Sequence, residues 1–428
     1  MFPAEFINEM TDTLGRERAQ RMLSALAGEP EVSVRVNPFK RTVGALRAHF
    51  GELAGEPVPW AAGEAFYLSQ RPSFTLDPLF HAGAYYVQEA SSMYAGQLFD
   101  RAVSALESPA GLRVLDLCAA PGGKTTQLLS HAGPASLVVA NEVMPARATV
   151  LAENVARWGC PGSVVTRSDP AAFASLHGFF DIVVADVPCS GEGMFRKDER
   201  AVAEWSPDAV RHCAARQRRI LADVWPALAP GGFLLYSTCT FNRTEDEDNV
   251  DWIAAELGAE IVTHRHFYPG EDRGEGFFAA LLRKNGSFSA RSCAPSPADA
   301  LTLIERRDLL KCFPTAFLKE LQLLEKSLTV IASGTAVALR KGRDLVPDAD
   351  LAMAVRRLPV AGLSFGTVPV SREEALRFLS KEPLVFSDHP RGWLLLEYEG
   401  LGIGFVKNLG NRSNNLLPAG RRIRCATR

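Results

Sequence analysis

The chain has 428 residues, of which 47% are hydrophobic and 22% charged, and its formal net charge is −2 at pH 7. This composition is typical of a soluble globular protein, and ~150 residues per domain predicts two to four domains. The charge balance excludes a chain that is basic throughout, so any nucleic-acid surface has to be local. No apolar run approaches the ~20 residues of a membrane span.

Targeting signals and cysteine usage point to the cytoplasm. The N-terminus carries Glu5, Glu9, Asp12 and Glu17 where a secretory signal needs an apolar core. The cysteines form no C-x-x-C pair, so we expect neither a metal site nor a disulfide framework. We therefore expect a cytoplasmic protein with reduced thiols, acting as a monomer away from membranes. The eight cysteines are at positions 118, 160, 189, 213, 239, 293, 312 and 425.

The first part of the chain mixes periodic and irregular segments. An apolar stripe predicts a helix over residues 3–27, and alternation predicts a strand over 31–36. Residues 41–110 are rich in Ala and Pro, so we predict mostly irregular structure there, with 85–92 leading into a helix. Three polar residues cluster in RVNPFK, where either a solvated turn or a contact with RNA accounts for them. They are Arg35, Asn37 and Lys40.

From residue 111 onward, predicted strands and helices alternate, which is the element order of an open, mostly parallel α/β sheet. One helix begins with Ser206 as N-cap and Pro207 at its first position. The predicted strands cover residues 113–118, 136–143, 163–167, 180–186, 233–237, 260–265 and 276–283, and the predicted helices include one that ends near 132 and one over 145–158.

The acidic run TEDE is predicted to begin a helix. Thr244 and Glu247 have the spacing of a capping box, in which two side chains satisfy each other's backbone N–H groups. Glu245 and Asp246 would then lie in the first turn and favour the helix dipole. We therefore expect no catalytic role for these acids.

The C-terminal part is predicted to contain a linker, a mixed segment and a basic end. Ser, Ala and Pro are typical of a linker over residues 284–299. Beyond it, patterns predict helices at 313–326 and 371–380 and strands near 328–340 and 352–357. The last 29 residues contain no acid, so we expect an RNA-facing patch, with a solvated charged face as the alternative. Its basic residues are Lys407, Arg412, Arg421, Arg422, Arg424 and Arg428.

Residues 114–125, VLDLCAAPGGKT, predict a strand, a tight turn and a helix. Small residues at such a turn let backbone N–H groups approach a nucleoside at the positive end of the helix. A P-loop would need glycine where the chain has Cys118, and a G-x-G-x-x-G fingerprint is absent. The looser D-x-G-x-G-x-G turn of S-adenosylmethionine (SAM) methyltransferases fits, with Asp116, Cys118, Ala120 and Gly122 in its four positions. An ordinary strand-to-helix turn is the alternative.

Glu142 ends the next apolar run, SLVVANEV, about 20 residues beyond Gly122. A carboxylate at the carboxyl end of the second strand is placed to accept hydrogen bonds from both ribose hydroxyls of a nucleoside. The alternative for a single Glu at a strand end is plain exposure to solvent.

Two later strands are predicted to end in cysteines, in DVPCSGEG and YSTCT. Cys189 and Cys239 should both face the cofactor, because parallel strands bring their carboxyl ends to one edge of the sheet. A cysteine thiolate can add to carbon 6 of a pyrimidine and make carbon 5 nucleophilic enough to accept a methyl group. Asp186 can hydrogen-bond N3 and offset charge on the ring. An adenine N6 enzyme would carry an aromatic residue in place of Cys189; two inert buried thiols are the alternative.

Together these motifs resemble the RNA 5-methylcytosine methyltransferases of the Sun/RsmF type. The resemblance rests on LDLCAAPGGKTTQL, on NEV followed by R-x-x-x-L-x-x-N-x-x-R-x-G, on ADVPCSGEGMFRKD and on YSTCTFNRTEDE. It covers roughly residues 1–285, and the tail with GWLLLEYEGLGIGFVKNLGNRSNNLLP resembles a PUA-like RNA-binding barrel. It implies SAM as methyl donor and a cytosine of small-subunit ribosomal RNA, free or within the subunit, as substrate.

The resemblance also implies roles for individual residues. Cys239, in the T-C motif, is the implied nucleophile, and Cys189, in the P-C motif, is implied to assist release of the product. The implied SAM-binding residues are Cys118, Ala119, Ala120, Pro121, Gly122, Gly123, Lys124, Glu142, Asp169 and Asp186.

The expected architecture is α/β, with a Rossmann-like class I SAM-dependent methyltransferase sheet over residues 106–285 and an N-terminal α+β RNA-binding extension over 1–105. A linker over 286–299, a small α/β domain over 300–362 and a PUA-like β-barrel over 363–428 follow. The alternatives are a tRNA cytosine-C5 methyltransferase, a DNA enzyme that attacks with the P-C cysteine, and a non-catalytic ribosome-assembly factor. The Thr-Cys pair and the tail disfavour the DNA enzyme, and the retained cysteines disfavour the assembly factor.

Overall fold

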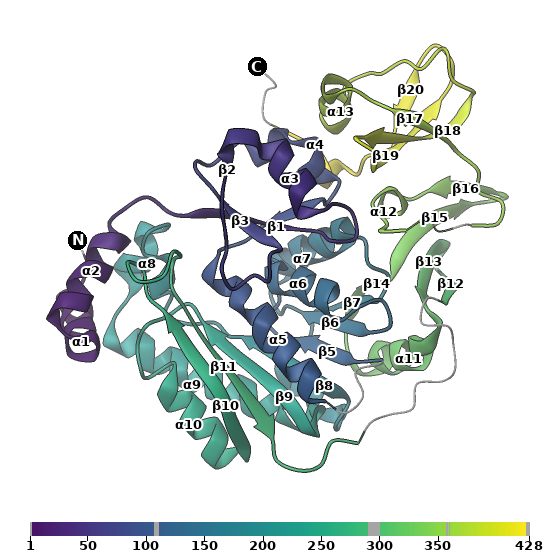
Figure 1. Cartoon of the computed structure of the whole chain (residues 1–428). Helices are drawn as coiled ribbons and strands as arrows, with labels where there is room; N and C mark the ends of the chain where they lie inside the picture. Colours follow the sequence, from purple (N-terminus) through teal and green to yellow (C-terminus); the bar gives the residue numbers. More distant parts are fainter. Residues whose placement is uncertain (1, 107–110, 290–299, 357, 359, 425–428) are drawn as a thin grey trace.

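The computed structural model describes residues 2–106, 111–289, 300–356, 358 and 360–424. Within these residues, a central sheet of eight strands is accompanied by three sheets of four strands (Figure 1). The N-terminal helices lie at one end of the molecule beside α8 (Glu199–Glu204), and the C-terminal strands lie at the opposite end.

The N-terminal extension is more regular than its composition predicts. The helix expected over 3–27 is two helices that meet at Gly15, whose φ of 77° suits glycine. The strand expected over 31–36 is confirmed, but the irregular structure predicted for 41–110 is wrong, because short elements held by tertiary packing show no long period. The elements are α1 (Ala4–Leu14), α2 (Arg16–Leu26), β1 (Val32–Val36), α3 (Val43–Phe50), β2 (Ala54–Pro57), β3 (Ala65–Leu68), α4 (Pro78–His81), β4 (Tyr85–Val87) and α5 (Tyr94–Ala105).

The predicted α/β order of the central region is confirmed. Its elements are β5 (Arg113–Asp116), α6 (Gly123–His131), β6 (Leu137–Asn141), α7 (Pro145–Trp158), β7 (Ser163–Thr166), β8 (Phe180–Asp186), α8, α9 (Pro207–Val224), β9 (Leu228–Thr238), α10 (Glu247–Glu256), β10 (Ala259–Phe267) and β11 (Phe277–Lys284). Strands β5 to β9 run parallel, and β10 and β11 are antiparallel at one edge. Ser206 caps α9 as expected, accepting from the N–H of Ala209 at 3.1 Å.

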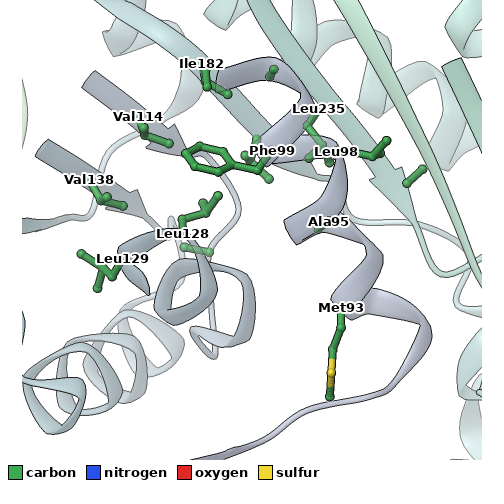
Figure 2. Close-up of a cluster of buried hydrophobic side chains, with 14 of the residues drawn as sticks. Met93, Ala95, Leu98, Phe99, Val114, Leu128, Leu129, Val138, Ile182 and Leu235 are labelled. Carbon is green, nitrogen blue, oxygen red and sulfur yellow. The ribbon is translucent and has the colours of Figure 1, made fainter. Parts of the chain in front are cut away.

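Apolar layers cover both faces of this sheet. On one face, Phe99 of α5 packs against Val114 and Ile182 of β5 and β8 (Figure 2). On the other face, Leu221 of α9 and Val250 of α10 belong to a second buried cluster with the strands. Because burying one such side chain stabilises the fold by ~1.5–3 kcal/mol, these layers fix the strand ends in place.

The C-terminal part is joined to the central sheet. Strand β14 pairs antiparallel with β7 at the sheet edge, so the segment 300–362, predicted as a small domain of its own, supplies the eighth strand. The strand predicted over 352–357 is wrong, because α12 ends at Ala352 and irregular backbone follows up to residue 356. The elements are β12 (Leu301–Arg306), β13 (Leu309–Pro314), α11 (Leu318–Ser327), β14 (Val330–Ser333), β15 (Thr335–Lys341), β16 (Asp344–Pro347), α12 (Ala349–Ala352), β17 (Gly366–Pro369), α13 (Arg372–Leu379), β18 (Gly392–Tyr398), β19 (Leu401–Asn408) and β20 (Ser413–Asn415).

The α-helix predicted at 313–326 begins only at Leu318, because β13 runs to Pro314 and a 3-10 turn occupies Thr315–Phe317. The helix predicted at 371–380 is confirmed as α13, with a capping box formed by Ser371 and Glu374. Of the expected linker, Lys284 belongs to β11, and residues 290–299 lie outside the described residues.

Neither a solvated turn nor an RNA contact describes the cluster in RVNPFK. Arg35 is 0% exposed and stacks on the Trp158 ring, with its guanidinium carbon 4.8 Å from the ring centroid. Its Nε donates to Oε1 of Gln88 at 2.8 Å, and its Nη2 donates to Oγ1 of Thr126 at 2.7 Å. The amide of Asn37, also 0% exposed, donates to the Trp158 carbonyl at 3.0 Å. These residues bind the extension to α6 and α7.

Lys40 also joins the extension to α7. Its Nζ donates to the carbonyl of Ala82 in the extension and to that of Arg157 in α7, both at 2.8 Å. Burial lowers the pKa of this amine to about 7. The two carbonyl acceptors supply the polar contacts that a buried amine needs.

We expect Arg35→Leu to lower the free energy of unfolding by ~3 kcal/mol, because Gln88 and Thr126 lose a charged donor inside the protein. Arg340→Leu provides the control, since Arg340 pairs with Glu305 at the surface and should cost at most ~1 kcal/mol. Urea denaturation measures both. Equal losses in the two variants would contradict a supporting role for Arg35.

Candidate active site

A cleft of about 360 Å³ opens where β5, β8 and β9 end. The carboxyl ends of parallel strands meet at this edge, which is the usual ligand site of such sheets. Its walls come from four parts of the chain: β4 and the segment after it, the turn before α6, residues near the two cysteine motifs, and the beginning of β11. The lining residues are Tyr86, Val87, Gln88, Glu89, Ser92, Asp116, Cys118, Ala119, Ala120, Pro121, Gly123, Lys124, Asp186, Gly193, Met194, Lys197, Cys239, Glu275, Gly276 and Phe277.

The predicted turn lies on the floor of this cleft. Gly122 precedes α6 with a φ of 113°, a conformation that side chains disfavour. Asp116 ends β5 and is 0% exposed, and its Oδ2 accepts from the hydroxyl of Thr125 at 2.6 Å. Its Oδ1 is buried without a hydrogen-bond partner among the described residues. Burial raises the pKa of Asp116 to about 7.

Asp186 and Lys124 meet across the cleft. Nζ of Lys124 lies 2.9 Å from Oδ2 of Asp186, and Oδ1 accepts from the hydroxyl of Ser237 at 2.7 Å. Lys124 also lies over the Phe277 ring, 4.8 Å from its centroid. These contacts orient the carboxylate at the end of β8 from two sides.

The two cysteines are neighbours. Sγ of Cys189 lies 3.2 Å from Sγ of Cys239. Cys239 lines the cleft, whereas Cys189 is not among its lining residues. The pKa of Cys189 is raised well above its ordinary value, first by its hydrogen bond with Cys239 and then by burial, with Glu245 adding repulsion. Cys189 is therefore a thiol at neutral pH and can donate to the Cys239 sulfur.

A buried carboxylate connects the two cysteine-bearing loops. Ser190 directly follows Cys189 in the sequence. The Glu245 carboxylate accepts from the N–H of Ser190 at 3.0 Å and from its hydroxyl. Nε2 of Gln217 and Nδ2 of Asn242 donate to the same carboxylate at 2.7 and 3.0 Å. Because Asn242 belongs to the loop after β9, Glu245 restrains both loops at once.

Glu192 forms a second connection. It is 0% exposed and accepts from the N–H of Phe241 at 2.6 Å, from Nε1 of Trp205 at 2.9 Å and from Nδ2 of Asn242 at 2.8 Å. Burial raises its pKa to about 7, while the three donors act in the opposite direction. The two loops are thus held by a closed polar network inside the protein.

The capping box predicted at Thr244 and Glu247 is wrong. Helix α10 begins at Glu247 after Asp246, and no side chain caps it. Glu245 and Asp246 are buried, and Asp246 accepts from the hydroxyl of Thr238 at 2.5 Å. The acidic run therefore supports the end of β9 and the cysteine loops, and it is part of the site.

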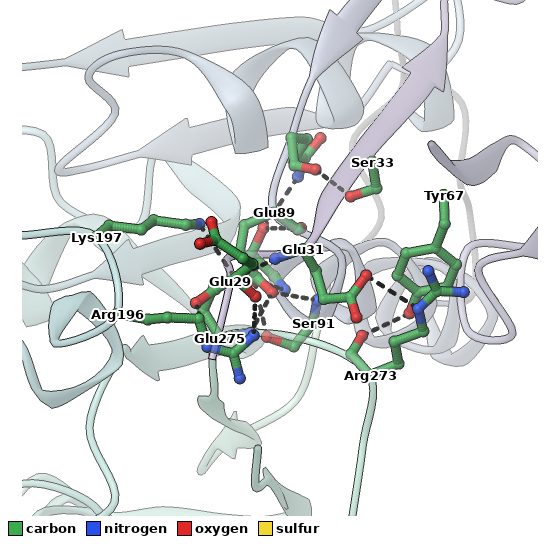
Figure 3. Close-up of polar contacts among 12 residues, drawn as sticks. Glu29, Glu31, Ser33, Tyr67, Glu89, Ser91, Arg196, Lys197, Arg273 and Glu275 are labelled. Atoms are coloured by element: carbon green, nitrogen blue, oxygen red, sulfur yellow. Dashed lines mark hydrogen bonds and ion pairs between the residues drawn. The ribbon is translucent and has the colours of Figure 1, made fainter. Parts of the chain in front are cut away.

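Residues of the extension and residues before β11 meet in a polar cluster that includes Glu89 and Glu275 of the cleft lining (Figure 3). Glu275, 2% exposed, accepts from the N–H of Glu31 at 2.9 Å and lies 3.4 Å from Nε of Arg196 and 3.7 Å from Nζ of Lys197. Its own N–H donates to Oε1 of Glu89 at 3.0 Å. Lys197 and Glu89 are therefore held at the cleft by residues from distant parts of the chain.

Three expected cofactor residues, Gly122, Glu142 and Asp169, lie outside the lining of this cleft. Glu142 is buried after β6, where Oε1 accepts from the N–H of Met144 at 2.9 Å and Oε2 lies 3.3 Å from Nη1 of Arg147. Asp169 is exposed and accepts from the N–H of Ala171 at 3.0 Å. Both carboxylates follow strands that end at the same sheet edge, and their contact with a cofactor stays a prediction.

The basic residues of the C-terminal end differ in their surroundings. Nη2 of Arg421 lies 2.6 Å from Oδ1 of Asp350, so its charge is already matched. Arg428 lies outside the described residues. The exposed ones are Lys407, Arg412, Arg422 and Arg424.

Several lining residues were missed by sequence reasoning. Tyr86 and Gln88 lie on and after β4, and Phe277 begins β11. The segment of Tyr86 and Gln88 carries no glycine turn or strand-end cysteine, whereas Gly276, with a φ of 100°, directly precedes Phe277 and was a signal that could have marked it. Asp116 was recognised as the first residue of the turn but was not included among the expected cofactor contacts.

Across the described residues, no three His, Cys, Asp or Glu side chains gather where they would hold a metal ion. Nor does that part of the chain contain a helix long and apolar enough to cross a membrane.

Three family models match successive parts of the chain. The model described as 16S rRNA methyltransferase RsmB/F matches residues 103–283, the N-terminal domain of 16S rRNA methyltransferase RsmF matches residues 2–90, and the methyltransferase RsmF PUA domain matches residues 365–423. The chain belongs to the RsmB/F methyltransferase family. The Sun/RsmF resemblance of its motifs and the expected Rossmann-like methyltransferase fold with a PUA domain are thereby confirmed.

Relatives in this family support the assignment. Ribosomal RNA small subunit methyltransferase F of Pectobacterium atrosepticum is 36% identical over 315 residues, which cover 67% of this chain and 63% of that protein. The protein of the same name from Cronobacter sakazakii is 35% identical over 316 residues, covering 67% and 64%. The chain thus spans less than two thirds of the length of these curated relatives.

Solved structures show the same fold. A methyltransferase homologue from Pyrococcus horikoshii is 29% identical with a TM-score of 0.57, and the match covers 66% of this chain and 95% of that one. NSun6 from the same organism, at 19% identity and a TM-score of 0.57, covers 67% of this chain and 99% of its own; this likeness concerns the fold alone.

Asp116 should make stability depend on pH. Its pKa of about 7 in the folded protein lies above the ~3.9 of an unfolded chain, so stability that is present at low pH is lost as the pH rises through 7. Relative to the unaltered protein, Asp116→Asn should therefore gain about 2–4 kcal/mol between pH 5 and pH 8 in urea denaturation. Asp12→Asn, at an exposed position, should show no such trend. A gain that is equal at both pH values would contradict the buried-acid interpretation.

Proposed function

We propose that this protein transfers a methyl group from SAM to carbon 5 of a cytosine in 16S ribosomal RNA, through a covalent bond between Cys239 and carbon 6. The observation that carries the proposal is the pair of cysteines, 3.2 Å apart, at a cleft that also holds Asp186 and the turn before α6. Family membership supports methylation of ribosomal RNA as the reaction.

The residues of the cleft suit SAM. When bound, SAM supplies an electrophilic methyl group. The small residues 118–124 leave backbone free to approach it, and the unpaired Oδ1 of Asp116 offers a buried acceptor for a cationic or N–H group. Glu142 and Asp169, which follow β6 and β7, are proposed to hold its ribose and base.

Attack and release place different demands on the two thiols. Addition of the Cys239 sulfur to carbon 6 raises the electron density on carbon 5, and Asp186, when it carries a proton, is proposed to donate it to N3 and so offset the charge on the ring. After methylation, the proton on carbon 5 has to leave so that the carbon–sulfur bond can break. Cys189, which is protonated and adjacent, is proposed to assist this release by passing its own proton to the Cys239 sulfur as the carbon–sulfur bond breaks and taking up the proton that leaves carbon 5.

The RNA target rests on the C-terminal domain. The exposed Lys407, Arg412, Arg422 and Arg424 are proposed to contact phosphates, whereas the charge of Arg421 is matched by Asp350. The PUA domain match supports an RNA substrate over DNA.

The cysteine variants separate attack from release. Cys239→Ala should transfer no methyl group and form no covalent complex with RNA. Cys189→Ala should still attack and then stall, leaving protein attached to RNA as a slow band on a denaturing gel that RNase removes. Cys213→Ala, an exchange on α9, is the control and should turn over normally. An adduct that forms in Cys239→Ala and is lost in Cys189→Ala would reverse the two roles.

Glu142→Ala should weaken SAM binding by ~10- to 100-fold, equivalent to the ~1.5–3 kcal/mol of one charged hydrogen bond. Calorimetric titration with SAM measures this directly. Glu256→Ala, at the end of α10, serves as the control and should bind SAM normally. Equal affinity in both variants would remove Glu142 from the cofactor site.

A further inference from the structure

A second cavity, of about 250 Å³, lies beside the catalytic cleft between β4 of the extension and α7. We refer to it as the side pocket. Its volume is below the ~300–1,000 Å³ of most ligand pockets, so it suits a single small unit. Its lining residues are Arg71, Phe74, Thr75, Phe80, Gly83, Tyr85, Tyr86, Val87, Asn154, Arg157 and Trp158.

The side pocket adjoins the cleft. Tyr86 and Val87 line both cavities. On the α7 side, Nδ2 of Asn154 donates to the carbonyl of Pro121, a residue of the catalytic turn, at 2.7 Å. A polymeric substrate that places one of its units at the cysteines therefore brings a neighbouring unit close to the side pocket.

The walls of the side pocket are preformed. Gly83, with a φ of 69°, packs so closely on α7 that an added Cβ would overlap the carbonyl of Arg157. The amide of Asn37 joins the carbonyls of Gly83 and Trp158 at 3.0 Å each. Lys40 joins the neighbouring carbonyls of the same two segments. The pocket therefore keeps its shape without a ligand.

The lining combines aromatic rings, cations and an unused donor. The guanidinium carbon of Arg157 lies 4.8 Å from the centroid of the Phe80 ring, and that of Arg71 lies 5.4 Å from that of Phe74. No carboxylate is found among the lining residues that the structure describes. Trp158 is 1% exposed, and its Nε1 has no acceptor within the described part of the chain.

These features match one nucleotide. Bases of single-stranded RNA stack on aromatic rings and on guanidinium planes, and arginine neutralises the phosphates. The Trp158 N–H offers a hydrogen bond to a base or sugar oxygen. A purely apolar ligand would leave both arginines and this donor without a partner, and a cation would be repelled by Arg71 and Arg157.

We propose that the side pocket binds a nucleotide of the RNA substrate that flanks the target cytosine, and so positions that cytosine at Cys239. The inference rests on the proposed function, since it takes RNA as the substrate. It adds a site in which the extension and α7 together hold the strand, apart from the PUA domain.

Substituting the two arginines tests this. In Arg71→Gln/Arg157→Gln, affinity for a fluorescein-labelled single-stranded RNA oligonucleotide should fall at least ~10-fold, and the slope of log affinity against log salt should drop by ~0.7 for each phosphate that is no longer neutralised. The matched control is Arg216→Gln/Arg219→Gln, which removes the same charge from exposed positions on α9, on the opposite face of the sheet. Melting temperatures verify that both double variants are folded.

A second measurement keeps the two proposals separate. Oligonucleotides carrying 4-thiouridine next to the cytosine should crosslink, on irradiation, to peptides containing Tyr86 or Trp158. Equal RNA affinity and salt slope in the two double variants, or crosslinks confined to the PUA domain, would overturn the side-pocket proposal. Methyl transfer by the unaltered protein tests the proposed function independently, because these binding measurements use no SAM.

Discussion

The geometry of the two cysteines depends on buried carboxylates that need hydrogen-bond donors. A carboxylate taken out of water is stable only where several N–H or O–H groups replace its hydration. Glu245 and Glu192 find those donors in the backbone of Ser190 and Phe241 and in the shared amide of Asn242. Since these donors belong to both cysteine-bearing loops, satisfying the carboxylates also brings the loops together. The hydrogen bonds that replace the hydration of these carboxylates therefore also fix the positions of the two cysteine-bearing loops.

A similar constraint makes the extension part of the catalytic unit. Arg35 is buried between a strand of the extension and helices of the central region, and its Nε and Nη2 donate to acceptors from the extension and from α6. Glu275 pairs with Arg196 and accepts from the backbone of Glu31. These contacts join the extension to the central region on the far side of the cleft as well. With β14 completing the central sheet, regions that look separable in the sequence share one polar and apolar interior.

Local signals predicted the central region well and the rest poorly. Helix α7 and strand β8 were predicted at their observed bounds because each has a clear period and distinct ends. Strands β2, β3 and β4 are only three or four residues long, too short to show a period, and they are held by pairing with one another and with β1. The TEDE run shows how a local rule fails: the spacing of a capping box is present, but α10 begins only at Glu247, and Glu245 is bonded to Ser190 instead of lying in the first turn. In the site, strand-end residues such as Asp186 and Cys239 were predicted, whereas Tyr86 and Gln88 reach the cleft only through tertiary packing.

The surroundings of the two thiols distinguish what their positions in the sequence do not. Both follow parallel strands, so topology alone leaves their roles equal. A negative charge on Cys189 would face Glu245 in a buried site, and repulsion together with burial favours its protonated form. Cys239 lines the cleft and has a protonated neighbour 3.2 Å away that can donate to its sulfur. A nucleophile has to reach its substrate as a thiolate, and a neighbouring thiol can return a proton to that sulfur when it leaves. The access of Cys239 to the cleft thus supports, independently of the family motifs, the proposal that Cys239 attacks and Cys189 assists release.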